Sequence, residues 1–140
     1  MREILFRGKR TDNGEWVRGY VAEIETAWDK YEYGSLPTEY EKVIIRTDLC
    51  VRDICAVLPE TVGQYTGLTD KNRKKIFEGD IVQVPLNIKE YFNCEIKFND
   101  GCFDVVQGNI RDYLKVYVAN RCVKVIGNIH DNPELLGGTE

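Results

Sequence analysis

Short stretches of alternating apolar and polar residues, or of clustered branched residues, follow one another along this chain. Residues 95–98 and 102–106 form the clearest pair, and Asn99-Asp100-Gly101 lies between them. A period of two residues is typical of a strand with one buried face, and an Asp-Gly pair favours the positive φ angles of a tight turn. We therefore predict a β-hairpin here.

A second hairpin is predicted over residues 4–24, because Asn13 and Gly14 tolerate positive φ between two strand-like runs. Further strands are predicted where branched residues cluster, at 43–46, 54–58, 80–84 and 123–126. Pro59 and Pro85 end two of these strands, since proline cannot donate to an interior ladder.

Residues 109–118 fit two structures. Asn109 is placed to cap a short helix in which Ile110, Leu114 and Tyr117 share one face. The branched and aromatic residues between 113 and 118 favour a strand at least as well. The pattern leaves both structures open.

Together these elements predict a mainly β fold, built as a small curved sheet or SH3-like barrel of short antiparallel strands. We expect one domain over residues 1–140, with an irregular insertion at about 25–42 and a β-rich C-terminal part at about 85–136. The insertion carries four aromatic residues: Trp28, Tyr31, Tyr33 and Tyr40. We expect their rings to fold back onto the barrel; the alternative is a surface offered to a partner.

Composition fits an ordinary globular protein. The chain has 140 residues, 43% of them hydrophobic and 30% charged, and no apolar run of membrane-spanning length. The first apolar run is too short for a signal peptide, so we expect a cytoplasmic protein. Five cysteines form an odd, irregularly spaced set, typical of reduced, buried thiols rather than disulfides.

Four segments resemble the YopX family of phage and prophage proteins, and they occur in the same order along the chain. They are residues 2–10 with Trp16 and Gly19-Tyr20, then 61–72, 76–82 and 125–136. The resemblance implies a compact, largely β fold with an SH3-like component, a phage-associated gene, and no established activity or catalytic residues. Arg73 stands where the family often has glycine, so either Asn72 adopts the left-handed conformation or the turn is reshaped.

A basic cluster is the main candidate for function. Tyr65 lies a few residues before four cations: Lys71, Arg73, Lys74 and Lys75. Such a cluster beside an aromatic ring could bind nucleic acid through phosphates and base stacking. The alternative is a solvated hairpin tip that discourages edge pairing. We favour the tip, because the net charge is −4 and Glu78 and Asp80 follow closely.

No other motif predicts catalysis, a cofactor or a metal site. Glu78 and Asp80 could join a third ligand around a cation, but we expect Gly79 to make a bend that Asp80 caps. His130 has no second histidine or placed nucleophile, so we expect a turn residue. The glycines lack phosphate-binding spacing.

The sequence therefore predicts a phage- or prophage-derived, non-catalytic module that binds a host or phage protein, or assembles with itself. Such a module would expose an aromatic patch at 28–40 or unpaired strand edges. The alternative function is accessory nucleic-acid binding through the basic tip. An enzyme is the least favoured class.

Overall fold

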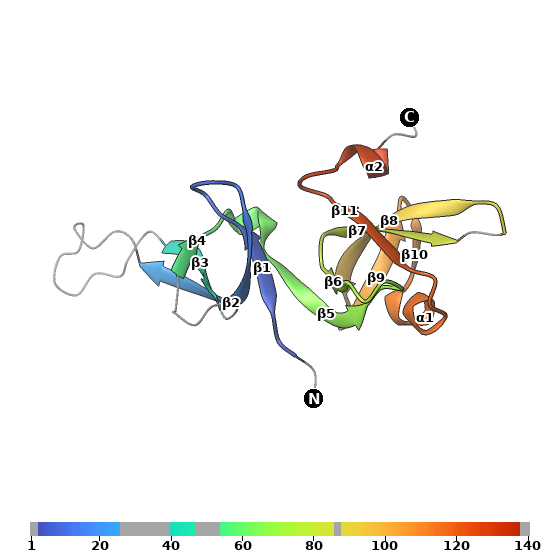
Figure 1. Cartoon of the computed structure of the whole chain (residues 1–140), viewed down its shortest axis with the longest axis horizontal. Coiled ribbons are helices and arrows are strands. Elements are labelled where there is room, and N and C mark those ends of the chain that lie inside the picture. Colours follow the sequence, from blue (N-terminus) through green and yellow to red (C-terminus); the bar gives the residue numbers. More distant parts are fainter. Residues whose placement is uncertain (1–2, 26–39, 47–53, 86–87, 138–140) are drawn as a thin grey trace. The chain divides into compact units, whose positions relative to one another are not determined.

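A computed structural model describes residues 3–25, 40–46, 54–85 and 88–137 (Figure 1). The chain splits into two compact units. The N-terminal unit is Ile4–Gly63, and the C-terminal unit is Gln64–Glu140 together with Met1–Glu3. A single domain over residues 1–140 stays a prediction. No helix among the described residues is long and apolar enough to cross a membrane.

The N-terminal unit is an antiparallel sheet in the order β4-β3-β2-β1. Its strands are β1 (Phe6–Lys9), β2 (Trp16–Glu25), β3 (Tyr40–Arg46) and β4 (Ile54–Ala56). A 3-10 helix, η2 (Pro59–Thr61), follows them. Four buried residues form the core of this unit: Val17, Ile44, Cys55 and Val57. The Thr61 hydroxyl accepts the Lys9 N–H at 2.9 Å and joins the helix to β1.

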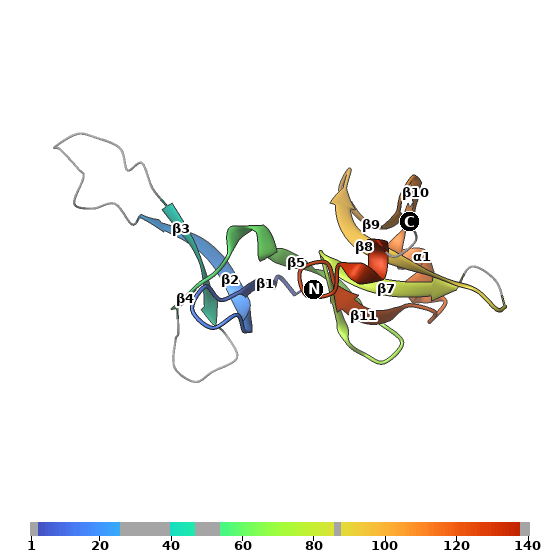
Figure 2. The ribbon, with the colours of Figure 1, turned by 90° about the horizontal axis from the view of Figure 1, so that it is seen from above.

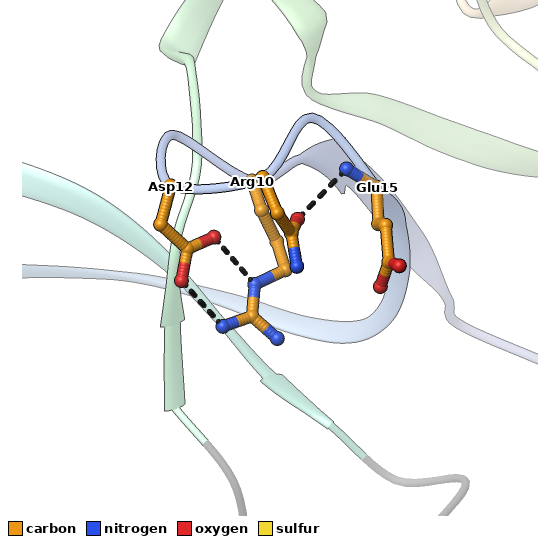
Figure 3. A network of polar contacts seen from close by, with 4 residues as sticks. Arg10, Asp12 and Glu15 are labelled. Atoms are coloured by element: carbon orange, nitrogen blue, oxygen red, sulfur yellow. Dashed lines mark hydrogen bonds and ion pairs between the residues drawn. The ribbon is translucent and has the colours of Figure 1, made fainter.

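The predicted turn at Asn13 and Gly14 is confirmed between β1 and β2, in a wider form. Only Gly14 has positive φ, at 73°, while the Asn13 side chain accepts the Glu15 N–H at 2.9 Å. Figure 3 shows the Arg10 guanidinium facing the Asp12 carboxylate, with contacts of 2.9 and 2.7 Å. This hydrogen bond lowers the pKa of Asp12 below its usual value.

The predicted aromatic insertion falls largely outside the described residues. Trp28, Tyr31 and Tyr33 all lie outside them. Tyr40 begins β3, and its side chain is also outside the description. The two alternatives for these rings therefore stay predictions.

The C-terminal unit begins with two paired strands, β5 (Gly63–Thr69) and β6 (Lys75–Phe77). A five-stranded antiparallel sheet follows in the order β10-β9-β8-β7-β11. Its strands are β7 (Asp80–Pro85), β8 (Tyr91–Asn99), β9 (Cys102–Gln107), β10 (Ile110–Tyr113) and β11 (Lys124–Asn128). Two short helices, α1 (Leu114–Ala119) and α2 (Glu134–Gly137), complete the unit, which Figure 2 shows from above.

Buried residues of these strands, of α1 and of the segment just before β11 form a second core. Its fully buried members include Ile76, Val82, Ile96, Leu114 and Val123. The mainly β class is therefore confirmed. Among the described strands the five-stranded sheet runs from an edge at β10 to an edge at β11, so these strands form an open curved sheet and not a closed SH3-like barrel.

The hairpin at Asn99-Asp100-Gly101 is confirmed, with φ of 49° at Asp100 and 79° at Gly101. The two predictions for 109–118 each hold in part. Residues 110–113 form β10, because a turn at Gly108 (φ 56°) returns the chain along β9. The helix begins only at Leu114, so the predicted cap at Asn109 is wrong.

The bend before β7 has the predicted cause. Gly79 has φ of 90°, and the Asp80 carboxylate accepts the Phe77 N–H at 2.8 Å. The cysteine prediction holds in part: Cys55 and Cys94 are buried, but Cys102 is exposed at the start of β9. Cys50 lies outside the described residues.

Candidate functional site

The basic segment is the tight turn between β5 and β6, and the carboxylate of Asp70 organises it. Asp70 Oδ1 accepts the N–H groups of Asn72 and Lys74 at 2.8 and 2.9 Å. Arg73 lies between them with φ of 65°. The sequence left open whether Asn72 adopts the left-handed conformation or the turn is reshaped. In the structure Arg73, at the position where glycine is common, itself adopts the left-handed conformation.

Tyr65 and Lys75 are engaged with their own unit. Tyr65 is 6% exposed, and its ring packs on Phe77 with centroids 5.5 Å apart. Lys75 Nζ lies 4.6 Å from the Tyr65 ring centre and 2.8 Å from a carboxylate oxygen of Glu3. A buried ring capped by a cation offers no face for stacking a base, so Tyr65 is not the aromatic platform that the sequence suggested.

Two of the predicted cations meet a third that the sequence analysis missed. Lys71, Arg73 and Arg121 line one hollow of about 380 Å³, which we call the basic hollow. Its other lining residues are Thr69, Asp70, Val118 and Val123. Arg121 follows α1 with φ of 55°, and no local pattern connects it to the β5–β6 turn. Lys74 is exposed and is not among the lining residues.

The two edges of the five-stranded sheet differ. At the β11 edge, Asp70 Oδ2 accepts the Val125 N–H at 3.0 Å, and the Lys71 N–H donates to the Val123 carbonyl at 2.9 Å. At the opposite edge, all four residues of β10 are exposed. Ile110 and Tyr113 there are 54% and 53% exposed. An unpaired edge with exposed apolar side chains is a ready template for another strand.

Beside β10 lies a second hollow of about 360 Å³, which we call the acidic hollow. It is lined by Asn99, Asp100, Cys102, Asp104, Arg111, Asp112 and Tyr113. Asp104 is only 3% exposed, and its Oδ1 atom is buried with no hydrogen-bond partner among the described residues. Its Oδ2 atom lies 3.6 Å from Arg111 Nε, which is too long for a hydrogen bond.

Asp112 is fully engaged by its neighbours. Its Oδ1 accepts the Tyr113 N–H at 2.8 Å, and its Oδ2 accepts the Tyr117 hydroxyl at 3.0 Å. Burial and this hydrogen bond raise the pKa of Tyr117. The Tyr113 N–H, a backbone donor of β10, is therefore already bonded to Asp112.

An apolar hollow of about 250 Å³ also borders β10. Its lining residues are Thr66, Leu68, Gly101, Cys102, Phe103, Tyr113 and Lys115. Tyr113 and Cys102 line both this hollow and the acidic one. The β10 edge is thus flanked by one charged and one apolar hollow, a combination suited to a peptide with alternating side chains.

The other candidate groups do not assemble into a site for chemistry. Asp80 is 2% exposed and directed to the Phe77 N–H. The His130 N–H donates to the Asn128 side chain at 3.0 Å, within a turn. Over the part of the chain that the structure describes, no group of three His, Cys, Asp or Glu residues could hold a metal ion.

Comparisons with known proteins give one family. A family model described as YopX protein matches residues 5–137. A curated relative, the SPbeta prophage-derived uncharacterized protein YopX of Bacillus subtilis (strain 168), is 36% identical over 72 residues, covering 48% of this chain and 54% of the relative. The chain therefore spans about half the length of that relative.

Two solved structures share the fold. Protein EF1440 from Enterococcus faecalis has a TM-score of 0.55 at 25% identity, covering 97% of this chain and 99% of its own. Protein yopX from Bacillus subtilis has a TM-score of 0.54 at 19% identity, covering 100% of both chains. The second likeness concerns the fold alone.

Proposed function

We propose a function on one established premise: this chain belongs to the YopX family. The proposed function is that of a non-catalytic module of phage or prophage origin, which binds an extended segment of another protein in the bacterial cytoplasm. The prophage origin of the Bacillus subtilis relative supports the phage part of this proposal.

The exposed edge strand carries the proposal. In the same sheet, Asp70 and Lys71 bind backbone groups of Val125 and Val123 at the start of the β11 edge, while all four β10 residues are exposed. Addition of a strand at such an edge supplies backbone hydrogen bonds for affinity and places alternate side chains in flanking pockets for specificity. The two hollows beside Tyr113 are suitable pockets.

The charge pattern of β10 favours a different protein over a second copy. In an antiparallel pair, residues directly opposite one another lie on the same face, whereas Arg111 and Asp112 are adjacent and lie on opposite faces. When two copies of β10 pair symmetrically about the middle of the strand, one residue must lie opposite the same residue of the other copy. That residue is either Arg111 or Asp112. Like charges directly opposite destabilise the pairing.

Site-specific photo-crosslinking in bacterial cells tests the proposal. A photoreactive amino acid replaces Ile110 on β10, and the matched control replaces Lys124, exposed on the closed β11 edge. We expect the Ile110 probe alone to give an adduct with one other protein, crosslinked within an extended segment of it. The proposal fails if both probes give the same adducts or none, or if the adduct is two copies of the 16.2 kDa chain.

Nucleic-acid binding is the second candidate, and the basic hollow is the observation that favours it. Arg121 joins Lys71 and Arg73 there, so three cations converge although the net charge of the chain is −4. Three cations around one hollow could contact adjacent phosphates. The buried Tyr65 ring weakens this candidate, because it removes the stacking surface.

A further inference from the structure

We propose that the acidic hollow is a specificity pocket that takes one arginine or lysine side chain from the strand added at β10. This inference rests on the function proposed above and names the chemistry that the partner must carry. The decisive observation is the Asp104 carboxylate, which is 3% exposed and lines the hollow. Within the described part of the chain its Oδ1 atom has no hydrogen-bond partner.

A buried carboxylate oxygen without a donor is unusual, because its desolvation is not offset by a hydrogen bond. The two nearby cations do not supply one. Arg111 Nε stays 3.6 Å from Oδ2. Lys97 is directly opposite Asp104 in the β8–β9 ladder, yet its Nζ atom lies 3.9 Å from Glu95. The site is therefore organised for a donor that the described residues do not provide.

The charge of the hollow selects a cation. Asp100, Asp104 and Asp112 line it together with a single cation, Arg111. The Arg111 side chain is 48% exposed, so it can turn to solvent when another cation enters. A guanidinium or ammonium group would both satisfy Asp104 and reduce the repulsion among the three carboxylates.

The sheet geometry limits the side chain to the two long cations. Asp104 is directly opposite Tyr113 on β10, and an added strand would lie on the far side of Tyr113. Two strand spacings separate Asp104 from that strand, a distance of about 10 Å. Only lysine or arginine crosses such a gap with a charged end. Tyr113 also lines the hollow, and an aromatic ring there attracts a cation.

Paired peptides test this inference on the full chain. One capped seven-residue peptide alternates threonine and valine around a central arginine. The other peptide has citrulline in place of the arginine. Citrulline keeps the shape of the arginine side chain and removes its positive charge. Binding is followed by NMR through the backbone amides of residues 102–113. We expect the arginine peptide to bind at least tenfold more tightly, and Asp104→Asn to abolish that preference.

Two further variants test the role of Arg111 and control for the change in net charge. Arg111→Gln removes the cation that lies nearest to Asp104 in the hollow, so we expect it to increase the arginine preference. Glu60→Gln, at an exposed position in the N-terminal unit, makes the charge change of Asp104→Asn and should leave the preference intact. Thermal melts establish that each variant is folded.

The outcomes separate the inference from the proposed function. Equal binding of both peptides at β10 overturns the specificity pocket and leaves the β10 interface standing. Failure of both peptides to shift the β10 amides overturns the β10 interface itself. An arginine preference that survives Asp104→Asn also overturns the pocket, since the charge would then be recognised elsewhere.

Discussion

The carboxylate of Asp70 holds the backbone N–H of Val125 at 3.0 Å, across a separation of 55 residues in the chain. The other oxygen of the same carboxylate holds the N–H groups of Asn72 and Lys74. One buried side chain therefore shapes the β5–β6 turn and closes the β11 edge of the five-stranded sheet. This double role makes Asp70 the strongest single target for testing the fold.

Replacing Asp70 by alanine should lower the free energy of unfolding by about 2 to 4 kcal/mol, because three backbone donors lose a charged acceptor. Asp70→Asn keeps one acceptor oxygen and should cost about half as much. Urea unfolding measures both. Hydrogen exchange at the Val125 amide should accelerate more than exchange at the Ile96 amide in the central strand β8.

Glu60→Ala is the control for this prediction, since Glu60 is exposed and should change stability by less than about 0.5 kcal/mol. If Asp70→Ala costs no more than this control, the hydrogen bonds of Asp70 do not stabilise the fold.

Arg73 has a strained backbone that glycine would relieve. Its φ of 65° costs a side-chain-bearing residue about 1 kcal/mol or more. Arg73→Gly should therefore raise the stability by about 0.5 to 1 kcal/mol, after the larger entropy of glycine in the unfolded chain is subtracted. Arg73→Ala removes the same charge and keeps the strain, so it should give no gain in denaturant unfolding. A gain with alanine equal to that with glycine would assign the effect to charge.

The second candidate function predicts that the three cations of the basic hollow act together. Arg121→Gln and Lys71→Gln should each weaken binding of a single-stranded thymidine oligonucleotide and lower the salt slope by about one. Lys97→Gln, on β8 outside the hollow, should leave binding unchanged. Fluorescence anisotropy at low salt measures this. Absence of binding by the unaltered chain removes nucleic-acid binding from consideration.

The thiols should differ widely in reactivity. Cys102 is exposed, whereas burial raises the pKa of Cys94 to about 11. Iodoacetamide at pH 8 should therefore modify Cys102 well before Cys94, as peptide mass spectrometry would record. Rapid labelling of Cys94 in the folded chain would contradict its burial in β8.

The same shift predicts a loss of stability in alkali. The folded pKa of Cys94 lies above the ordinary value of about 8.5, so the unfolded chain releases the proton first. The stabilisation that the protonated Cys94 thiol gives the fold is complete below a pH of about 8.5, and it declines as the pH rises toward about 11. Relative to Cys94→Ala, the parent chain should lose more stability between these limits in urea unfolding at stepped pH.

Sequence reasoning succeeded where the chemistry is local. The turn at Asp100 and Gly101 and the bend at Gly79 with its Asp80 cap depend on neighbouring residues and on the φ angles that glycine permits. The mainly β class follows from many such segments. In each case, the residues that determine the structure lie within one short stretch of the chain.

The site depends on contacts between distant residues, which no single pattern encodes. Arg121 reaches the basic hollow because Lys71 and Asp70 pair with the segment that follows α1. Tyr65 lies close to the cations in sequence and could have stacked on a base, but pairing of β5 with β6 places it against Phe77. Asp104 is unremarkable in sequence, and its unpartnered oxygen is known only once β9 and β10 are in register.

The central charges of β10 should be what prevents this edge from pairing with a second copy. In the double variant Arg111→Thr with Asp112→Thr, both symmetric registers lose their like-charge contacts, and the Tyr113 N–H loses its Asp112 acceptor. Light scattering should therefore show the parent as a monomer and the double variant as a concentration-dependent dimer. Adding Ile110→Lys to the double variant returns a cation to the edge and should restore the monomer. A parent chain that already dimerises through β10, shown by crosslinking between copies at Ile110, would mean that like charges do not control this edge.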